Sequence, residues 1–165
     1  MFAAMRFIHI IAGIVWAGGA VLMNLVIGPA IGATGDAGRQ FAGHLMGKTV
    51  FSKIMLGSGL LTVLAGTYLY GVSSNWFTSG WMLSGQGLGF GIGAAAGIVA
   101  LVFGYMIGKT NGRLAALGAQ IQGKPTDEQM ALMGALRKRQ VFVTTGNTIF
   151  ILISIALMAS ARFFG

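Results

Sequence analysis

The chain has 165 residues, enough for one domain, and 55% of them are hydrophobic while 8% are charged. This composition, with a mean hydropathy of +0.79, excludes an ordinary water-soluble globular protein and indicates an integral membrane protein. The formal net charge of +8 is expected to reflect membrane topology rather than nucleic-acid binding.

Four long apolar segments follow one another along the chain. A bilayer core about 30 Å thick needs about 20 mostly apolar residues per helix. Such stretches lie at about 7–31, 49–71, 86–108 and 141–164. The sequence therefore predicts an all-α membrane protein, a four-helix bundle that forms a single domain over residues 1–165.

Basic residues are distributed unevenly between the connections. All Lys and Arg residues except Arg6 and Arg162 flank the first and third connections. Short loops rich in Lys and Arg stay in the cytoplasm. The distribution predicts a multi-pass protein of the cell inner (plasma) membrane with both termini outside the cytoplasm.

The three connections differ in composition. The first predicts a short amphipathic helix, and the second, at 72–85, has no charge and carries two Trp residues, which is typical of the membrane–water interface. In the third, Thr126 and Gln129 form a capping-box pattern that restarts a helix after a Gly-Lys-Pro break. Spans three and four are therefore predicted to extend into the cytoplasm as a helical hairpin.

Small and polar residues at helical spacing predict how the helices pack. The third span repeats glycine every four residues, at Gly85, Gly89, Gly93 and Gly97. Such a groove lets another helix approach closely, and it favours a homo-oligomer or a subunit packed through its glycine faces. Asn24 and Asn147 lie at similar depth in the first and fourth spans, so a hydrogen bond between their amides is expected.

One stripe of the fourth span is predicted to face the interior of the bundle. It combines polar and small residues at helical spacing: Thr144, Asn147, Thr148, Ile151, Ser154, Met158, Ala161 and Arg162. Polar side chains on such a stripe are typical of hydrogen bonding between membrane helices.

His9 lies about one turn inside the outer end of the first span, where ionisable side chains are rare. Arg6, Gly13 and Trp16 stand three, four and seven residues away and share its helical face. A flat macrocycle held by histidine needs a nitrogen ligand, a wall of small residues and a surface cation for its carboxylates. The cluster is a candidate heme b site, and a hydrogen-bonded histidine without a cofactor is the alternative.

Other spans offer further candidates at the same level. Arg162 is a second candidate partner for heme carboxylates, and Tyr68 lies near the outer end of the second span. Met158 is the first candidate for a second iron ligand beside His9, Met82 in the outer loop is the next, and a five-coordinate iron is equally allowed. His44 lies about 30 Å away and is expected to be solvated. The ten Met residues are scattered, which favours packing over copper handling.

The run from Phe7 to Gly19, FIHIIAGIVWAGG, resembles the first helix of the CopD-like (copper-resistance D / HemJ-related) superfamily of small four-helix membrane proteins. The specific part of the resemblance is His9, Trp16 and the Gly18-Gly19 pair. The resemblance implies a b-type heme protein, because relatives include HemJ-type membrane protoporphyrinogen oxidases in which the matching histidine is a heme ligand. His9 takes that role by position.

These observations together predict a membrane-embedded b-type heme protein. Its expected role is one-electron transfer with a quinone or a periplasmic partner. The enzyme class that fits such a heme is a heme-dependent membrane oxidoreductase. The alternative, from a different class, is a cofactor-free structural or transport subunit of a membrane complex.

Overall fold

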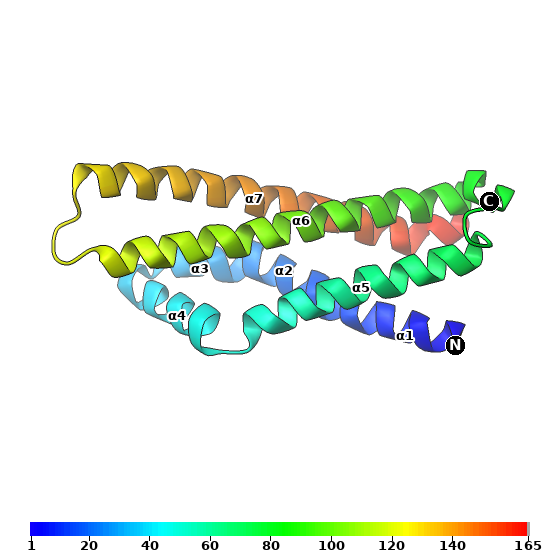
Figure 1. Ribbon diagram of the computed structural model, residues 1–165, viewed down its shortest axis with the longest axis horizontal. Helices are drawn as coiled ribbons and strands as arrows, with labels where there is room; N and C mark the ends of the chain where they lie inside the picture. Colours follow the sequence, from blue (N-terminus) through cyan, green and yellow to red (C-terminus); the bar gives the residue numbers. More distant parts are fainter. Residues whose placement is uncertain (165) are drawn as a thin grey trace.

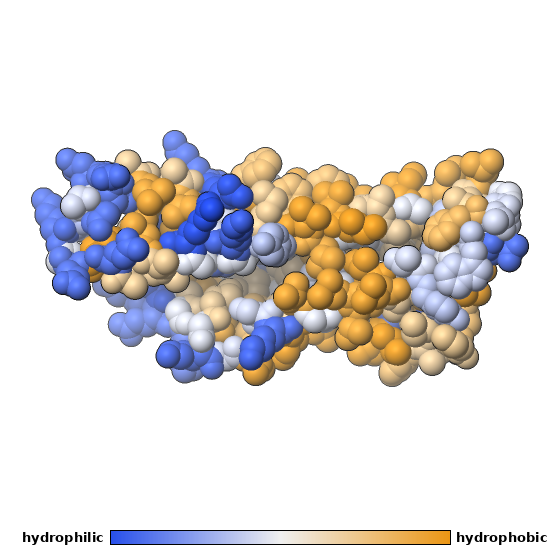
Figure 2. All heavy atoms as spheres, in the orientation of Figure 1, coloured by the Kyte–Doolittle hydropathy of each residue, from blue (hydrophilic) through white to orange (hydrophobic). Residues whose placement is uncertain are grey.

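The computed structural model describes residues 1–164, in which helices are joined by short connections and no strand occurs. Within this range, four helices are long and apolar enough to cross a membrane: Phe2–Ala33, Phe51–Ser73, Gly85–Gln120 and Asp127–Phe163. The all-α class is confirmed, and the helices are compatible with a multi-pass protein in a lipid bilayer. Figure 2 shows most hydrophobic residues over the middle and right of the molecule, the hydrophilic ones gathered mainly at its left end, and a smaller group of paler and blue residues at the right edge.

The first long helix is continuous but not uniform. It consists of α1 (Phe2–Gly13), η1 (Ile14–Gly18), α2 (Gly19–Leu22), η2 (Met23–Ile27) and α3 (Gly28–Ala33). The segments η1 and η2 are π-helical turns. Pro29 follows η2, and because it has no N–H and its ring crowds the carbonyl one turn earlier, the backbone widens before it. The uninterrupted helix predicted at about 7–31 is thus longer at both ends and contains two π turns.

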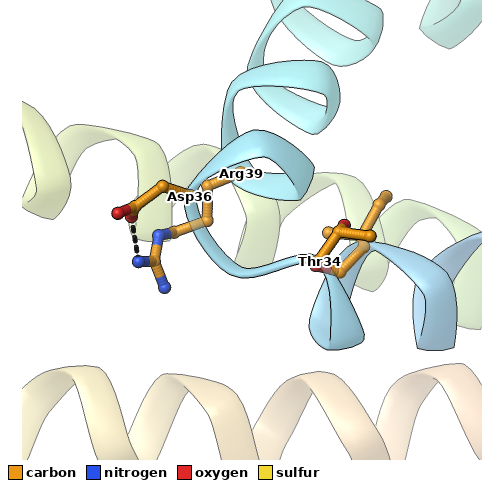
Figure 3. Close-up of polar contacts among 4 residues, drawn as sticks. Thr34, Asp36 and Arg39 are labelled. Carbon is orange, nitrogen blue, oxygen red and sulfur yellow. Dashed lines mark hydrogen bonds and ion pairs between the residues drawn. The ribbon is translucent and has the colours of Figure 1, made fainter.

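The chain turns sharply after this helix. Gly35 has a φ of 58°, a left-handed conformation that glycine adopts without strain, and it begins α4 (Gly35–Lys48), the short helix predicted for the first connection. Figure 3 shows this turn, with Thr34 at the end of α3 and an ion pair between Asp36 and Arg39 in the first turn of α4. Both charged side chains are exposed, so this pair contributes little to stability.

The second long helix, α5 (Phe51–Ser73), runs back beside α1 and ends in a strained turn (Figure 1). Three consecutive residues that are not glycine have positive φ there: Asn75, Trp76 and Phe77. The buried Ser74 stabilises the turn, because its Oγ accepts a hydrogen bond from the Phe77 N–H at 3.0 Å. A short 3₁₀ helix, η3 (Gly80–Leu83), leads into the third long helix.

The two longest helices, α6 (Gly85–Gln120) and α7 (Asp127–Ser160), lie side by side along most of their length (Figure 1). They extend well beyond the apolar spans that hydropathy predicts. The capping box at the start of α7 is confirmed, since the Thr126 hydroxyl accepts from the Gln129 N–H at 3.2 Å and the Gln129 side chain accepts from the Thr126 N–H at 2.9 Å.

Most of the predicted interior stripe of α7 is indeed covered. Asn147, Thr148, Ile151 and Ala161 are buried, and Thr144, Ser154 and Met158 are half-buried. Arg162 is the exception, because it is exposed. The α-helix has given way to the 3₁₀ turn η4 (Ala161–Phe163) at this point, so the helical spacing that predicted an inward position no longer applies.

A buried polar network joins three of the long helices. The Asn24 amide nitrogen donates to Asn147 Oδ1 at 3.2 Å and to Thr148 Oγ1 at 2.9 Å, so the predicted amide bond is confirmed. The Asn147 amide nitrogen in turn donates to the Ala100 carbonyl at 2.8 Å. Because Asn147 is 2% exposed, its side chain depends on these partners for its hydrogen bonds.

The first long helix and α7 contact each other near this network and diverge toward the end that carries both termini (Figure 1). The first long helix contacts α7 through α2 and η2, beside a core of Trp16, Ala20, Ala100 and Ile151. Farther out, α1 packs on α5 and α7 packs on α6, and Figure 1 shows the two terminal helices diverging there. His9 lies on α1, in the part of the first long helix that packs on α5.

Candidate functional site around His9

His9 is held in a defined orientation by the second long helix. The residue is half-buried on α1, and its Nδ1 lies 2.8 Å from the main-chain carbonyl oxygen of Thr62 on α5. A carbonyl only accepts hydrogen bonds, so Nδ1 is the donor and a neutral ring carries its lone pair on Nε2. Within residues 1–164, Nε2 has no hydrogen-bond partner and is not enclosed by protein.

Two glycines let α1 and α5 approach each other at this point. A Cβ atom on Gly66 would lie 2.8 Å from His9 Cε1 and 3.0 Å from Nδ1, so the imidazole edge rests directly on the α5 backbone. A Cβ on Gly13 would lie 3.6 Å from the Thr62 methyl group, which is ordinary van der Waals contact. The small wall predicted at Gly13 therefore faces α5.

Trp16 belongs to the interior of the bundle rather than to the surroundings of the imidazole. The residue is 7% exposed, and its side chain packs in the core, where the first long helix meets α6 and α7. A Cβ on Gly59 would lie 3.1 Å from the indole nitrogen, so the indole also rests against α5. Because Trp16 lies two turns after His9 and its indole also rests on α5, it helps to hold the His9 face of the helix toward α5.

The two outward arginines belong to different helix pairs. Arg6 is exposed on α1, which packs on α5. Arg162 is exposed on η4, which packs on α6, and its guanidinium lies 4.6 Å from the centre of the Phe163 ring. Arg6 shares the helix of His9, whereas the contacts of Arg162 are with other elements.

Tyr68 and Met158 likewise make their contacts elsewhere. Tyr68 packs edge-on against Trp76, with ring centres 6.1 Å apart. The Met158 methyl group would lie 3.4 Å from a Cβ on Gly93, so its thioether packs on α6. His9 packs on α5, so different helices hold the two candidate iron ligands.

The arrangement at His9 fits a heme ligand in one specific respect. Histidines that bind metals usually donate their other ring N–H to a carbonyl or carboxylate, which fixes the tautomer and leaves the remaining nitrogen free. His9 has this arrangement. A shallow groove of about 420 Å³ also lies between α1 and α5, but His9 is not part of its lining, which is mostly apolar: Phe7, Ile8, Ile11, Ala12, Val15, Ile54, Gly57, Ser58 and Leu61.

Two residues of the site were not predicted from the sequence. Thr62 contributes a main-chain oxygen and Gly66 contributes the absence of a side chain, so neither carries a chemical signature. One sequence signal could have indicated them. A glycine leaves the carbonyl four residues before it uncovered, and a polar side chain at the same depth on another helix can then bond to that carbonyl.

No protein-family model matches the chain, and no curated protein or solved structure matches it either. The resemblance of the first helix to the CopD-like superfamily stays a prediction. Function is therefore inferred from His9 and from the contacts that hold it.

Proposed function

We propose that the protein is a membrane-embedded b-type heme protein in which Nε2 of His9 would hold the iron. The observation that supports this is the hydrogen bond from Nδ1 to the Thr62 carbonyl, which leaves Nε2 of a neutral ring with a lone pair and without a hydrogen bond in the described residues. When bound, heme supplies one-electron redox chemistry, here with a membrane quinone or a periplasmic partner. The Thr62 carbonyl orients the imidazole.

Arg6 is the best-supported partner for a heme propionate, because it is exposed three residues from His9 on the same helix. Arg162 would be the second. A five-coordinate iron is favoured over ligation by Met158, since the thioether packs against α6 at Gly93.

The proposed topology follows the distribution of charge. Both termini would lie outside the cytoplasm, and the ends of α6 and α7 with the connection between them would form a cytoplasmic hairpin that carries most of the basic residues. We place the protein in the inner membrane, as a homo-oligomer or as a subunit of a larger complex, and in the CopD-like superfamily.

A cofactor-free membrane subunit is the second candidate function. It is favoured by the close contact of the His9 ring with Gly66. An imidazole that packs between two helices and hydrogen-bonds to one of them can serve only to hold the helices together. In this case the basic hairpin would dock anionic lipid or a cytoplasmic protein.

Absorption spectroscopy of the purified protein distinguishes the two candidates. Protein expressed with ample heme should show a Soret band that shifts when dithionite reduces the iron. His9→Ala should abolish the band, and His44→Ala, the matched control on α4, should keep it. Met158→Leu should leave the band unchanged if the iron is five-coordinate.

Two results would reject the heme proposal as stated. A colourless wild-type protein under heme-replete expression would favour the cofactor-free subunit. A band that survives His9→Ala and disappears with His44→Ala would place the iron at the opposite end of the molecule.

A further inference from the structure

Four hydrogen bonds in the described chain join a side chain to a main-chain carbonyl of another long helix. Three connect α1 to α5 and α7 to α6 at 2.8 Å, and the fourth connects α5 to α6 at 3.3 Å. The donors with their acceptors are His9 with Thr62, Asn147 with Ala100, Ser154 with Gly93, and Tyr70 with Gly87. In every case the residue four positions after the acceptor is a glycine, namely Gly66, Gly104, Gly97 and Gly91.

This recurrence has a physical cause. The Cβ of each helical residue is tilted toward the N-terminus and lies over the preceding turn, where the carbonyl of the residue four positions earlier is located. A glycine leaves that carbonyl uncovered, so its second lone pair can accept a bond from a neighbouring helix. A Cβ at these glycines would lie 3.0 Å from the donor atom of His9, 3.1 Å from that of Tyr70, 3.2 Å from that of Ser154 and 3.7 Å from that of Asn147.

We infer that Gly66 is the positioning residue of His9, because it uncovers the Thr62 carbonyl and thereby fixes the ring proton on Nδ1 and the lone pair on Nε2. Gly66 shows the shortest of the four approaches to a donor atom, and a Cβ there would also meet Cε1 at 2.8 Å. A methyl group at this position would move the ring away and cover its acceptor. The tautomer follows from the contacts alone, whereas its use for iron binding rests on the proposed function.

The tautomer can be measured without any cofactor. ¹⁵N-histidine-labelled protein in a His44→Gln background has one histidine, and its two nitrogen resonances distinguish a protonated from a bare nitrogen. With Gly66 present, a neutral ring should show a protonated Nδ1 and a bare Nε2. Gly66→Ala should remove this pattern. Gly57→Ala, the same change on the same helix with open space around it, should preserve it.

A bare Nδ1 in the protein that retains Gly66 would overturn the inference, even if Gly66→Ala failed to fold. An unchanged pattern in a folded Gly66→Ala protein would overturn it as well.

Heme content of the same variants separates this inference from the proposed function. Gly66→Ala should weaken heme binding by about tenfold or more, seen as a lower Soret absorbance per protein, and Gly57→Ala should leave it unchanged. If no variant or wild-type protein binds heme but the nitrogen spectra are as expected, the heme proposal fails and the positioning role stands. If Gly66→Ala binds heme as wild type does, the positioning role fails while the heme proposal stands.

Discussion

The α1–α5 pair and the α6–α7 pair are joined by the same kind of hydrogen bond, but they use it with different results. Between α6 and α7, the buried Asn147 donates to a carbonyl and also accepts from Asn24. Between α1 and α5, the half-buried His9 donates through Nδ1, and its Nε2 makes no hydrogen bond within the described residues. The comparison teaches that the same kind of bond can use all the polar atoms of a buried side chain in one helix pair, and in another pair can orient a ring whose second nitrogen makes no hydrogen bond within the described residues.

The largest expected effect on stability is at Asn147. Asn147→Ala removes the bonds to Ala100 and Asn24 and leaves a cavity, and we expect the free energy of unfolding to fall by about 2 kcal/mol. His9→Ala, which removes one bond at a half-buried site, should cost about 1 kcal/mol. Denaturant titration of the two variants in mixed micelles checks the difference. A greater loss for His9→Ala would reverse the proposed roles of the two helix pairs.

An intermediate effect is expected at Gly97. A Cβ there would lie 3.2 Å from Ser154 Oγ, so Gly97→Ala should weaken the bond to Gly93 and lower the free energy of unfolding by about 1 kcal/mol. Gly112→Ala is the matched control on α6, where nothing lies within 4 Å of the new Cβ. It should stabilise the helix by roughly 0.5–1 kcal/mol, since alanine has the higher helix propensity. Thermal unfolding of both variants measures the sign, and a stabilising Gly97→Ala would contradict the role assigned to this glycine.

The smallest effect is expected at Gly104. Its Cβ would lie 3.7 Å from the Asn147 amide nitrogen, which is ordinary contact, so Gly104→Ala should change the free energy of unfolding by less than about 0.5 kcal/mol. The same titrations apply. If Gly104→Ala were more destabilising than Gly97→Ala, the approach of the new Cβ to the donor atom would not explain the cost.

Features that depend on spacing along one helix were predicted well. The capping box of Thr126 and Gln129 follows from residues three positions apart. The bond between Asn24 and Asn147 was predicted because depth in a membrane can be counted from the helix ends. The two π turns were not predicted, because hydropathy does not indicate which carbonyl each backbone N–H bonds to.

The surroundings of His9 were predicted only in part. Gly13 was expected beside the histidine, and it does face α5 close to this point. Arg162 and Met158 were expected near it by depth, but their contacts are with Phe163 and with α6. Equal depth on two helices does not bring two side chains together unless the helices are neighbours and their faces are turned toward each other.

The sequence by itself determined that the chain is helical, how many apolar helices it contains and which of their faces are polar or small, because these properties depend on composition and periodicity within each segment. The tertiary structure decided that α1 pairs with α5 while α6 pairs with α7, and it thereby decided that the proton of His9 is directed to the Thr62 carbonyl. A main-chain carbonyl has the same chemistry at every position in the sequence. Only the rotation and depth of a neighbouring helix, together with a missing side chain four residues on, make one of them an acceptor.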